Sequence, residues 1–146
     1  MVSRFYAIDE ANAALPEVDR ILVALRDQRE ELIALRDRVI EATPDGDETP
    51  TTGAAEQIRL LRLGMQGLID QMQAGVARLV EMDITLRDIS TGLIDFPALV
   101  SGRPIWLCWR LGEDDVAHWH AHDAGFDSRR PLSELPMGRG SGTPAA

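Results

Sequence analysis

The chain has no lysine, only one cysteine, few aromatic residues and no long apolar run, and each shortage excludes a class of protein. All 15 basic residues are arginine, and 24 acidic residues bring the net charge to −9, so the clustered positive surface that nucleic acids require is not expected. The single cysteine, Cys108, cannot form an internal disulfide, which agrees with a reducing compartment. No apolar run approaches the ~20 residues of a spanning helix, and residues 1–16 do not resemble a signal peptide. We therefore expect a cytoplasmic protein with neither a membrane nor a nucleic-acid partner.

Two long stretches have the apolar spacing of helices that pack side by side. The first runs from Pro16, which suits a first helical turn, to about Ile40, and a short helix start is expected just before it at Asp9. Its apolar positions follow 4-3-4-3 spacing, with one polar residue among them: Ile21, Leu25, Gln28, Leu32, Leu35 and Val39. The second, residues 54–82, repeats the spacing at Ile58, Leu61, Met65, Leu68, Met72, Val76 and Leu79. With the Pro-, Gly- and Thr-rich loop 43–53 between them, they predict an antiparallel, coiled-coil-like helical hairpin.

Each predicted helix also carries a second apolar line, which widens its face beyond what one partner helix covers. These lines consist of Leu22, Ile33 and Ile40 on the first helix and Leu60, Ile69 and Val80 on the second. A homodimer that forms a four-helix arrangement would bury them. The alternative is that the C-terminal part of the chain folds back over the same lines.

From Asp83 onward the pattern changes to that of a small antiparallel sheet. Ile84, Leu86 and Ile89 are spaced more like a strand than a helix, and a Ser-Thr-Gly turn follows them. Residues 103–110 form an apolar run of strand length that contains two of the three tryptophans. We expect these strands at the open end of the hairpin, joined by Phe5 and Tyr6. Residues 133–146 have almost nothing to bury and predict a disordered tail.

The segment 112–125 contains all three histidines and allows two interpretations. As a strand, it would point His118, His120 and His122 to one face, where they could bind a metal ion. As a helix, it would have acids in its first turn, histidines in its last, and Gly125 at the position of a C-terminal cap. The helix is the preferred interpretation, and the predicted fold is therefore α+β, with a short helix beside the small sheet.

On that predicted helix, Glu113, His120 and Asp123 share one sector with Val116 and Trp119. Ionisable groups beside buried apolar ones must be paired or bind something. Three possibilities remain open: a divalent-metal site, with zinc as the expected metal, to which Cys108 adds a sulfur ligand; a structural hydrogen-bond network; or a small-molecule or general-base site in which Asp123 orients His120. On the outer side of such a helix, His118 and His122 are expected to be ordinary surface residues.

Three further residues belong to the candidate site. Cys108, which lies in an apolar run, is expected to be an inert core residue rather than a nucleophile. Asp95 either caps a turn before Pro97 or faces the same pocket as His120, and Arg129 can pair with the acids of the segment. The sequence contains no Gly-rich phosphate loop, CxxC pair, HExxH sequence or nucleophile elbow, so no enzyme class is supported.

Several segments together resemble a bacterial family known as a domain of unknown function, DUF2203. They are FYAIDEANAALP (5–16), LRDISTGLIDFP (86–97), LCWRLGE (107–113), Trp119-His120 followed by Asp123, Gly125-Phe126 and the run RRPL (129–132). The resemblance implies no established activity. It selects Asp88, Asp95, Cys108, Glu113, His120, an acid near Asp123, and Arg129, whereas His118 and His122 lie outside the family's pattern.

The sequence therefore predicts one domain over residues 1–132 with two alternative functions. The first is a cytoplasmic binding module whose pocket holds a divalent metal or a small ligand. In it, Cys108, Glu113, His120 and Asp123 are the predicted metal ligands, and Asp95 and Arg129 the predicted ligand-binding residues. The second is a dimerising hairpin whose polar cluster is only structural.

Overall fold

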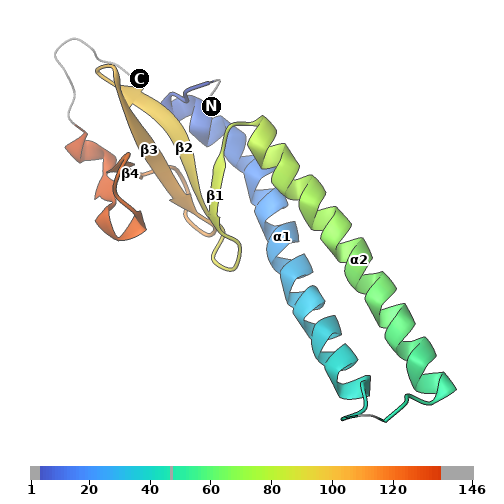
Figure 1. The fold of residues 1–146 in the computed structure, drawn as a ribbon. Coiled ribbons are helices and arrows are strands. Elements are labelled where there is room, and N and C mark those ends of the chain that lie inside the picture. The colour runs from blue at the N-terminus through green and yellow to red at the C-terminus, as the bar shows by residue number, and fades with distance from the viewer. Residues whose placement is uncertain (1–3, 47, 136–146) are drawn as a thin grey trace.

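The computed structural model describes residues 4–46 and 48–135 and shows a helical hairpin joined to an antiparallel sheet (Figure 1). Helices α1 (Ile8–Ala42) and α2 (Thr52–Glu81) lie side by side. The strands are β1 (Thr85–Asp88), β2 (Leu93–Val100), β3 (Arg103–Arg110), β4 (His118–Ala121) and β5 (Arg130–Pro131). Two short 3-10 helices, η1 (Phe126–Ser128) and η2 (Leu132–Glu134), flank β5. The α+β fold and the hairpin are confirmed.

Helix α1 begins at Ile8, next to the helix start expected at Asp9, and passes through Pro16, where a second helix was predicted to begin, without a break. Its first turn is capped by Glu10, whose carboxylate accepts a hydrogen bond from the Ala7 N–H at 2.8 Å. The helix continues because Ala11, Leu15 and Val18 extend an apolar line that the sheet buries. This packing outweighs the one backbone hydrogen bond that proline removes. The interpretation of Pro16 as a helix start was therefore wrong.

The predicted line of contact between the two helices is present. Leu25, Leu61, Leu68 and Leu79 are buried, and the other apolar members of the line are half-buried. Gln28, the one polar residue in the line of the first helix, has a polar partner on the second helix: its side-chain amide donates to the Gln71 side-chain oxygen at 3.3 Å. None of the described helices is long and apolar enough to cross a membrane.

The five strands form an antiparallel meander in the order β1-β2-β3-β4-β5. A two-residue turn joins β2 to β3, with Ser101 at φ +53° and Gly102 at φ +78°, the left-handed pair that tight hairpins require. Gly92, before β2, has φ +68°, and a Cβ there would lie 2.5 Å from the Cβ of Leu111. The Tyr6 N–H donates to the Pro97 carbonyl at 2.8 Å, so the N-terminal segment joins the sheet edge as expected.

One face of the sheet packs on the hairpin and makes the core. Along β2 and β3, alternate residues belong to this core: Ile94, Phe96, Ala98, Val100, Ile105, Leu107 and Trp109. Trp119 of β4 joins them, together with the first half of α1 and Leu79 of α2. Leu22, assigned above to the second apolar line, is thus covered by the sheet, whereas Ile40, Leu60 and Val80 remain exposed.

The short helix predicted beside the sheet is present only in part: η1 and η2 lie there, but the histidine segment itself is not helical. Residues 113–117 are irregular, with a bend at 114–115, and His118–Ala121 form strand β4, which pairs with β3 in the register Leu107↔Trp119 and Trp106↔His120. Gly125 has φ −109°, so it is not the left-handed C-terminal cap that was predicted, and it stands instead at the N-terminal cap position of η1. Strand β3 needs a hydrogen-bonding partner on its second edge, and this long-range pairing overrides a local preference for helix. Of the predicted tail, 133–135 are described, Ser133 and Glu134 within η2, whereas 136–146 lie outside the described residues.

Candidate metal site on the outer face of the sheet

Three ionisable side chains meet on the face of the sheet that points away from the helices. Asp95 of β2 and Cys108 of β3 are directly opposite each other in the strand register, and His120 comes from β4. All three residues are at most 2 % exposed, and their potential ligand atoms lie within 4.8 Å of one another. Because side chains alternate along a strand, the residues next to each of these three in sequence point to the opposite face, toward the core.

His120 is fixed at both ring nitrogens. Its Nε2 lies 3.0 Å from each carboxylate oxygen of Asp95, and its Nδ1 lies 3.0 Å from the backbone carbonyl oxygen of Ala121. All three of these oxygens are hydrogen-bond acceptors, so both ring nitrogens must present either a proton or a bound cation. With the proton on Nδ1, the lone pair of Nε2 points toward Asp95 and is free for a cation.

Asp95 has a second partner at the edge of the sheet. The Nε–H of Arg87 in β1 donates to Asp95 Oδ2 at 2.8 Å, and the guanidinium carbon of Arg87 lies 5.0 Å from the centre of the Trp106 ring. The buried carboxylate is therefore satisfied by one arginine and one histidine.

The thiol of Cys108 is held in its neutral form. Burial and the nearby Asp95 carboxylate raise the pKa of Cys108 to about 11, although a hydrogen bond with Arg129 acts in the opposite direction. A thiol in this state is a poor nucleophile, which agrees with the expectation of an unreactive cysteine. A divalent cation would reverse this preference, because metal coordination deprotonates a thiol.

A pocket of about 170 Å³ opens above the group formed by Asp95, Cys108 and His120. Arg87 and Leu93 line one side, and Ala124, Gly125 and Phe126 of the segment after β4 line the other. The arrangement thus provides three ligand atoms of different chemistry beneath a small partly enclosed space.

The other predicted site residues lie apart from this group or beside it. Glu113 forms a two-pronged ion pair with Arg129, at 3.2 and 2.7 Å, and also accepts from the Arg110 N–H at 2.9 Å. Burial is the largest single influence on the pKa of Glu113 and raises it, but the hydrogen bonds from Arg129 and the Arg110 N–H together with the charge of Arg129 outweigh burial, so the pKa is lowered. Asp123 is exposed and is not part of the group.

The strand interpretation also needs qualification, because the three histidines do not converge. His118 is half-buried in the same strand as His120, whereas His122 lies beyond the strand and stacks on Trp106, with ring centres 4.8 Å apart. Among the described residues, only Asp95, Cys108 and His120 meet the geometry of a metal site.

Sequence reasoning brought Cys108 and His120 together but did not assign Asp95 to the metal ligands, and it missed Arg87 and Phe126. Asp95 could have been recognised, since it is the one acid inside the apolar strand 93–100 and lies between Ile94 and Phe96, which point to the opposite face. Arg87 carries no such signal, because only the pairing of β1 with β2 brings it to Asp95.

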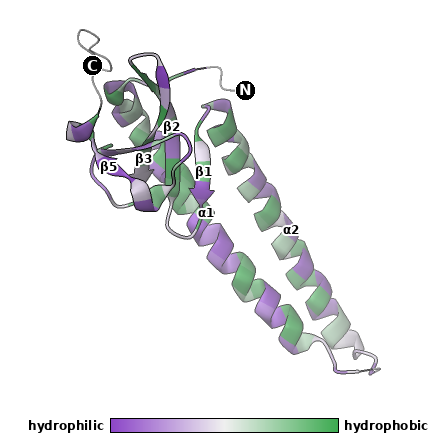
Figure 2. Cartoon of the chain, turned by 60° about the vertical axis from the view of Figure 1, so that its left-hand side comes forward, coloured by the Kyte–Doolittle hydropathy of each residue, from purple (hydrophilic) through white to green (hydrophobic). Residues whose placement is uncertain are grey.

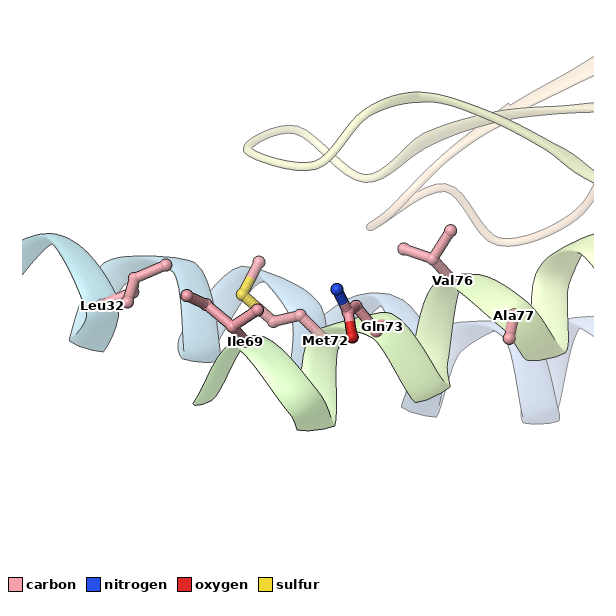
Figure 3. A pocket seen from close by; sticks show the side chains of 6 residues that line it. All are labelled: Leu32, Ile69, Met72, Gln73, Val76 and Ala77. Carbon is pink, nitrogen blue, oxygen red and sulfur yellow. The ribbon is translucent and has the colours of Figure 1, made fainter. Parts of the chain in front are cut away.

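A second and larger hollow, of about 430 Å³, lies on the hairpin (Figure 3). Figure 3 shows Leu32 of α1 close to Ile69 and Met72 of α2. The hollow is also lined by Gln73, Val76 and Ala77, and none of its lining residues is ionisable. The hollow therefore offers an apolar packing surface rather than a site for chemistry.

Comparison with known proteins adds the family and nothing on activity. No curated protein and no solved structure matches the chain. The family model described as "Uncharacterized conserved protein (DUF2203)" matches residues 4–132, which include every strand of the sheet and all three residues of the candidate site. The chain therefore belongs to the DUF2203 family.

Proposed function

We propose that the protein is a metal-binding module in which Asp95, Cys108 and His120 hold one divalent ion, with zinc as the best-fitting metal. The observation that carries the proposal is the convergence of one carboxylate, one thiol and one imidazole from three adjacent strands, with all ligand atoms within 4.8 Å. Oxygen, sulfur and nitrogen are the three donor types that zinc accepts in proteins.

The distances need little adjustment for tetrahedral coordination. Zinc bonds of ~2.0 Å to nitrogen and oxygen place these two atoms about 3.3 Å apart, and a ~2.3 Å bond to sulfur places sulfur and nitrogen about 3.5 Å apart. The nitrogen of His120 and the oxygens of Asp95 are 3.0 Å apart, and no separation within the group exceeds 4.8 Å. Side-chain rotations that move the ligand atoms by about an ångström would therefore complete the site.

The surroundings of the three residues also suit a metal centre. The Ala121 carbonyl holds the proton of His120 on Nδ1 and leaves Nε2 for the ion, as outer hydrogen bonds do in metal sites. Arg87 keeps Asp95 Oδ2 occupied, so Oδ1 is the natural ligand atom. Three protein ligands leave a fourth position, which would face the pocket above the group.

Metal analysis of protein purified without an affinity tag tests the proposal. We expect about one equivalent of zinc to bind and to raise the melting temperature of the protein. The matched control is His118→Ala, which removes a histidine from the same strand but outside the group, and it should retain the metal that His120→Ala loses. Less than about a tenth of an equivalent, with no thermal shift on adding zinc, would refute the proposal.

A second candidate function, a homodimerising hairpin, is favoured by the apolar surface of the distal half. Beyond Leu25, α1 continues for about 25 Å at 1.5 Å per residue, and none of its residues there is fully buried. Ile40, Leu60 and Leu63, which lie toward the loop end, are each more than half exposed. Figure 2 shows hydrophobic residues continuing along α2 toward the loop end, away from the sheet.

The occupant that fits this surface best is a second copy of the chain. Residues 26–41 carry five acids and four arginines, and residues 54–70 carry two of each, so this region is nearly neutral although the chain carries −9. Two copies can thus approach without the repulsion that the whole charge would cause. Light scattering at tens of micromolar should return the mass of a dimer. Leu60→Glu should return a monomer, and a monomer for the unmodified protein would reject this candidate.

A further inference from the structure

The pocket above Asp95, Cys108 and His120 has one charged residue at its rim and apolar walls. Arg87 is the only cation among the eight residues recorded as lining it, and Leu93, Ala124, Gly125 and Phe126 supply carbon surface. A ligand that fits this lining combines one negative group with a short apolar part.

The geometry of the pocket gives an anion two partners. Asp95, Cys108 and His120 line its floor, where a divalent ion would bind, and Arg87 lines its rim. An anion in the pocket would therefore have a positive charge on both sides.

Arg87 is positioned to bind that anion directly. Its Nε–H is used by Asp95, its guanidinium is steadied by Trp106, and its side chain is 41 % exposed. In the part of the chain that the structure describes, its two terminal nitrogens have no recorded hydrogen-bond partner. Their N–H groups are free to pair with a planar carboxylate.

The volume of the pocket favours a small ligand. About 170 Å³ lies below the range of roughly 300–1,000 Å³ that is usual for pockets of drug-sized ligands. A carboxylate with a short alkyl chain suits this space better than a nucleotide does.

We propose that the metal-loaded pocket binds a small monocarboxylate, with the carboxylate between the metal ion and Arg87 and the alkyl group against Leu93 and Phe126. The inference rests on the metal-binding function proposed above. The carboxylate takes the fourth coordination position, so its binding and the binding of the metal strengthen each other.

Zinc affinity measured by competition with a chelator, with and without propionate at constant ionic strength, tests the inference. We expect propionate to tighten zinc binding about fivefold, and the uncharged propionamide to leave it unchanged. In Arg87→Met the effect of propionate should disappear, whatever the zinc affinity of that variant. Arg103→Met, which removes an exposed arginine from the start of β3, should keep the full effect.

The outcomes separate this inference from the proposed function. Zinc binding without any effect of propionate, or with an equal effect in Arg87→Met, would overturn the carboxylate site and leave the metal site standing. A larger effect of inorganic phosphate than of propionate would also overturn it, because the apolar walls would then have no role. Absence of zinc binding would overturn both.

Discussion

The two faces of the sheet are built from the same strands but have opposite chemistry. Toward the helices, Phe96, Leu107 and Trp109 are buried with other apolar side chains. On the face that points away from the helices, Asp95, which precedes Phe96, and Cys108, which follows Leu107, meet His120 beneath a pocket. Residues that are adjacent in sequence therefore lie on opposite faces, so substitutions at adjacent positions should affect stability and metal binding differently.

Leu107→Ala and Cys108→Ala should give the largest contrast between the two faces. Leu107 is buried in the main core, and its truncation should lower the free energy of unfolding by about 2–5 kcal/mol. Cys108→Ala, on the outer face, should lower it by about 1 kcal/mol while abolishing zinc binding. Chemical denaturation followed by circular dichroism measures both effects. Equal losses would contradict the division into a packing face and a chemical face.

The reactivity of Cys108 should be suppressed by about two orders of magnitude in the folded protein. Its pKa of about 11 leaves far less thiolate near pH 8 than an unfolded cysteine has, and burial further hinders access. Alkylation rates with and without denaturant measure the difference. A native rate close to the denatured rate would show that the thiol is exposed and ionised, and the outer face would then be open to solvent.

Two histidines of β4 allow a finer comparison within the outer face. His120→Ala should lower the free energy of unfolding by about 2 kcal/mol, because it leaves the buried Asp95 with Arg87 as its only partner. His118→Ala should change it by less than about 1 kcal/mol, since His118 is half-exposed and its Nδ1 has no partner among the described residues. Thermal unfolding at low salt compares them, and equal effects would reject the special position of His120.

The smallest effect is expected at Asp88, at the end of β1. Hydrogen bonds from the Thr91 hydroxyl, the Ser90 hydroxyl and the Thr91 N–H lower the pKa of Asp88. A lowered pKa in the folded state contributes stability that is present above the unfolded value of about 4 and is lost as the pH falls through the folded value. Because the group is exposed, Asp88→Asn should cost less than about 1 kcal/mol at neutral pH. The difference should vanish in acid, and a difference that grew in acid would contradict this assignment.

The hairpin could be predicted from the sequence because its signal is local. The 4-3-4-3 line from Ile21 to Val39, and its repeat in 58–79, specify both helices and the sides that meet. The continuity of α1 through Pro16 could not be predicted in this way, because Pro16 is a strong local signal and only the sheet shows that Ala11 and Leu15 are buried. The boundary error therefore has a tertiary cause.

The site depended on information that no local pattern contains. Acids before the histidines and a glycine after them suit a helix, but strand pairing with β3 decides the structure and brings His120 toward Asp95. Strand register, which follows from long-range pairing, also places Asp95 opposite Cys108. Individual residues of the site, and the proximity of Cys108 to His120, could thus be predicted from the sequence, whereas the place of Asp95 among the metal ligands could not.

The optical spectrum of the protein with cobalt(II) in place of zinc tests the central claim most directly, because it reports which atoms bind the metal. We predict a sulfur-to-cobalt charge-transfer band that saturates at one equivalent, is absent in Cys108→Ala and His120→Ala, and persists in His118→Ala. Cobalt binding without the charge-transfer band, or a band that survives in His120→Ala, would contradict a metal centre made by Asp95, Cys108 and His120.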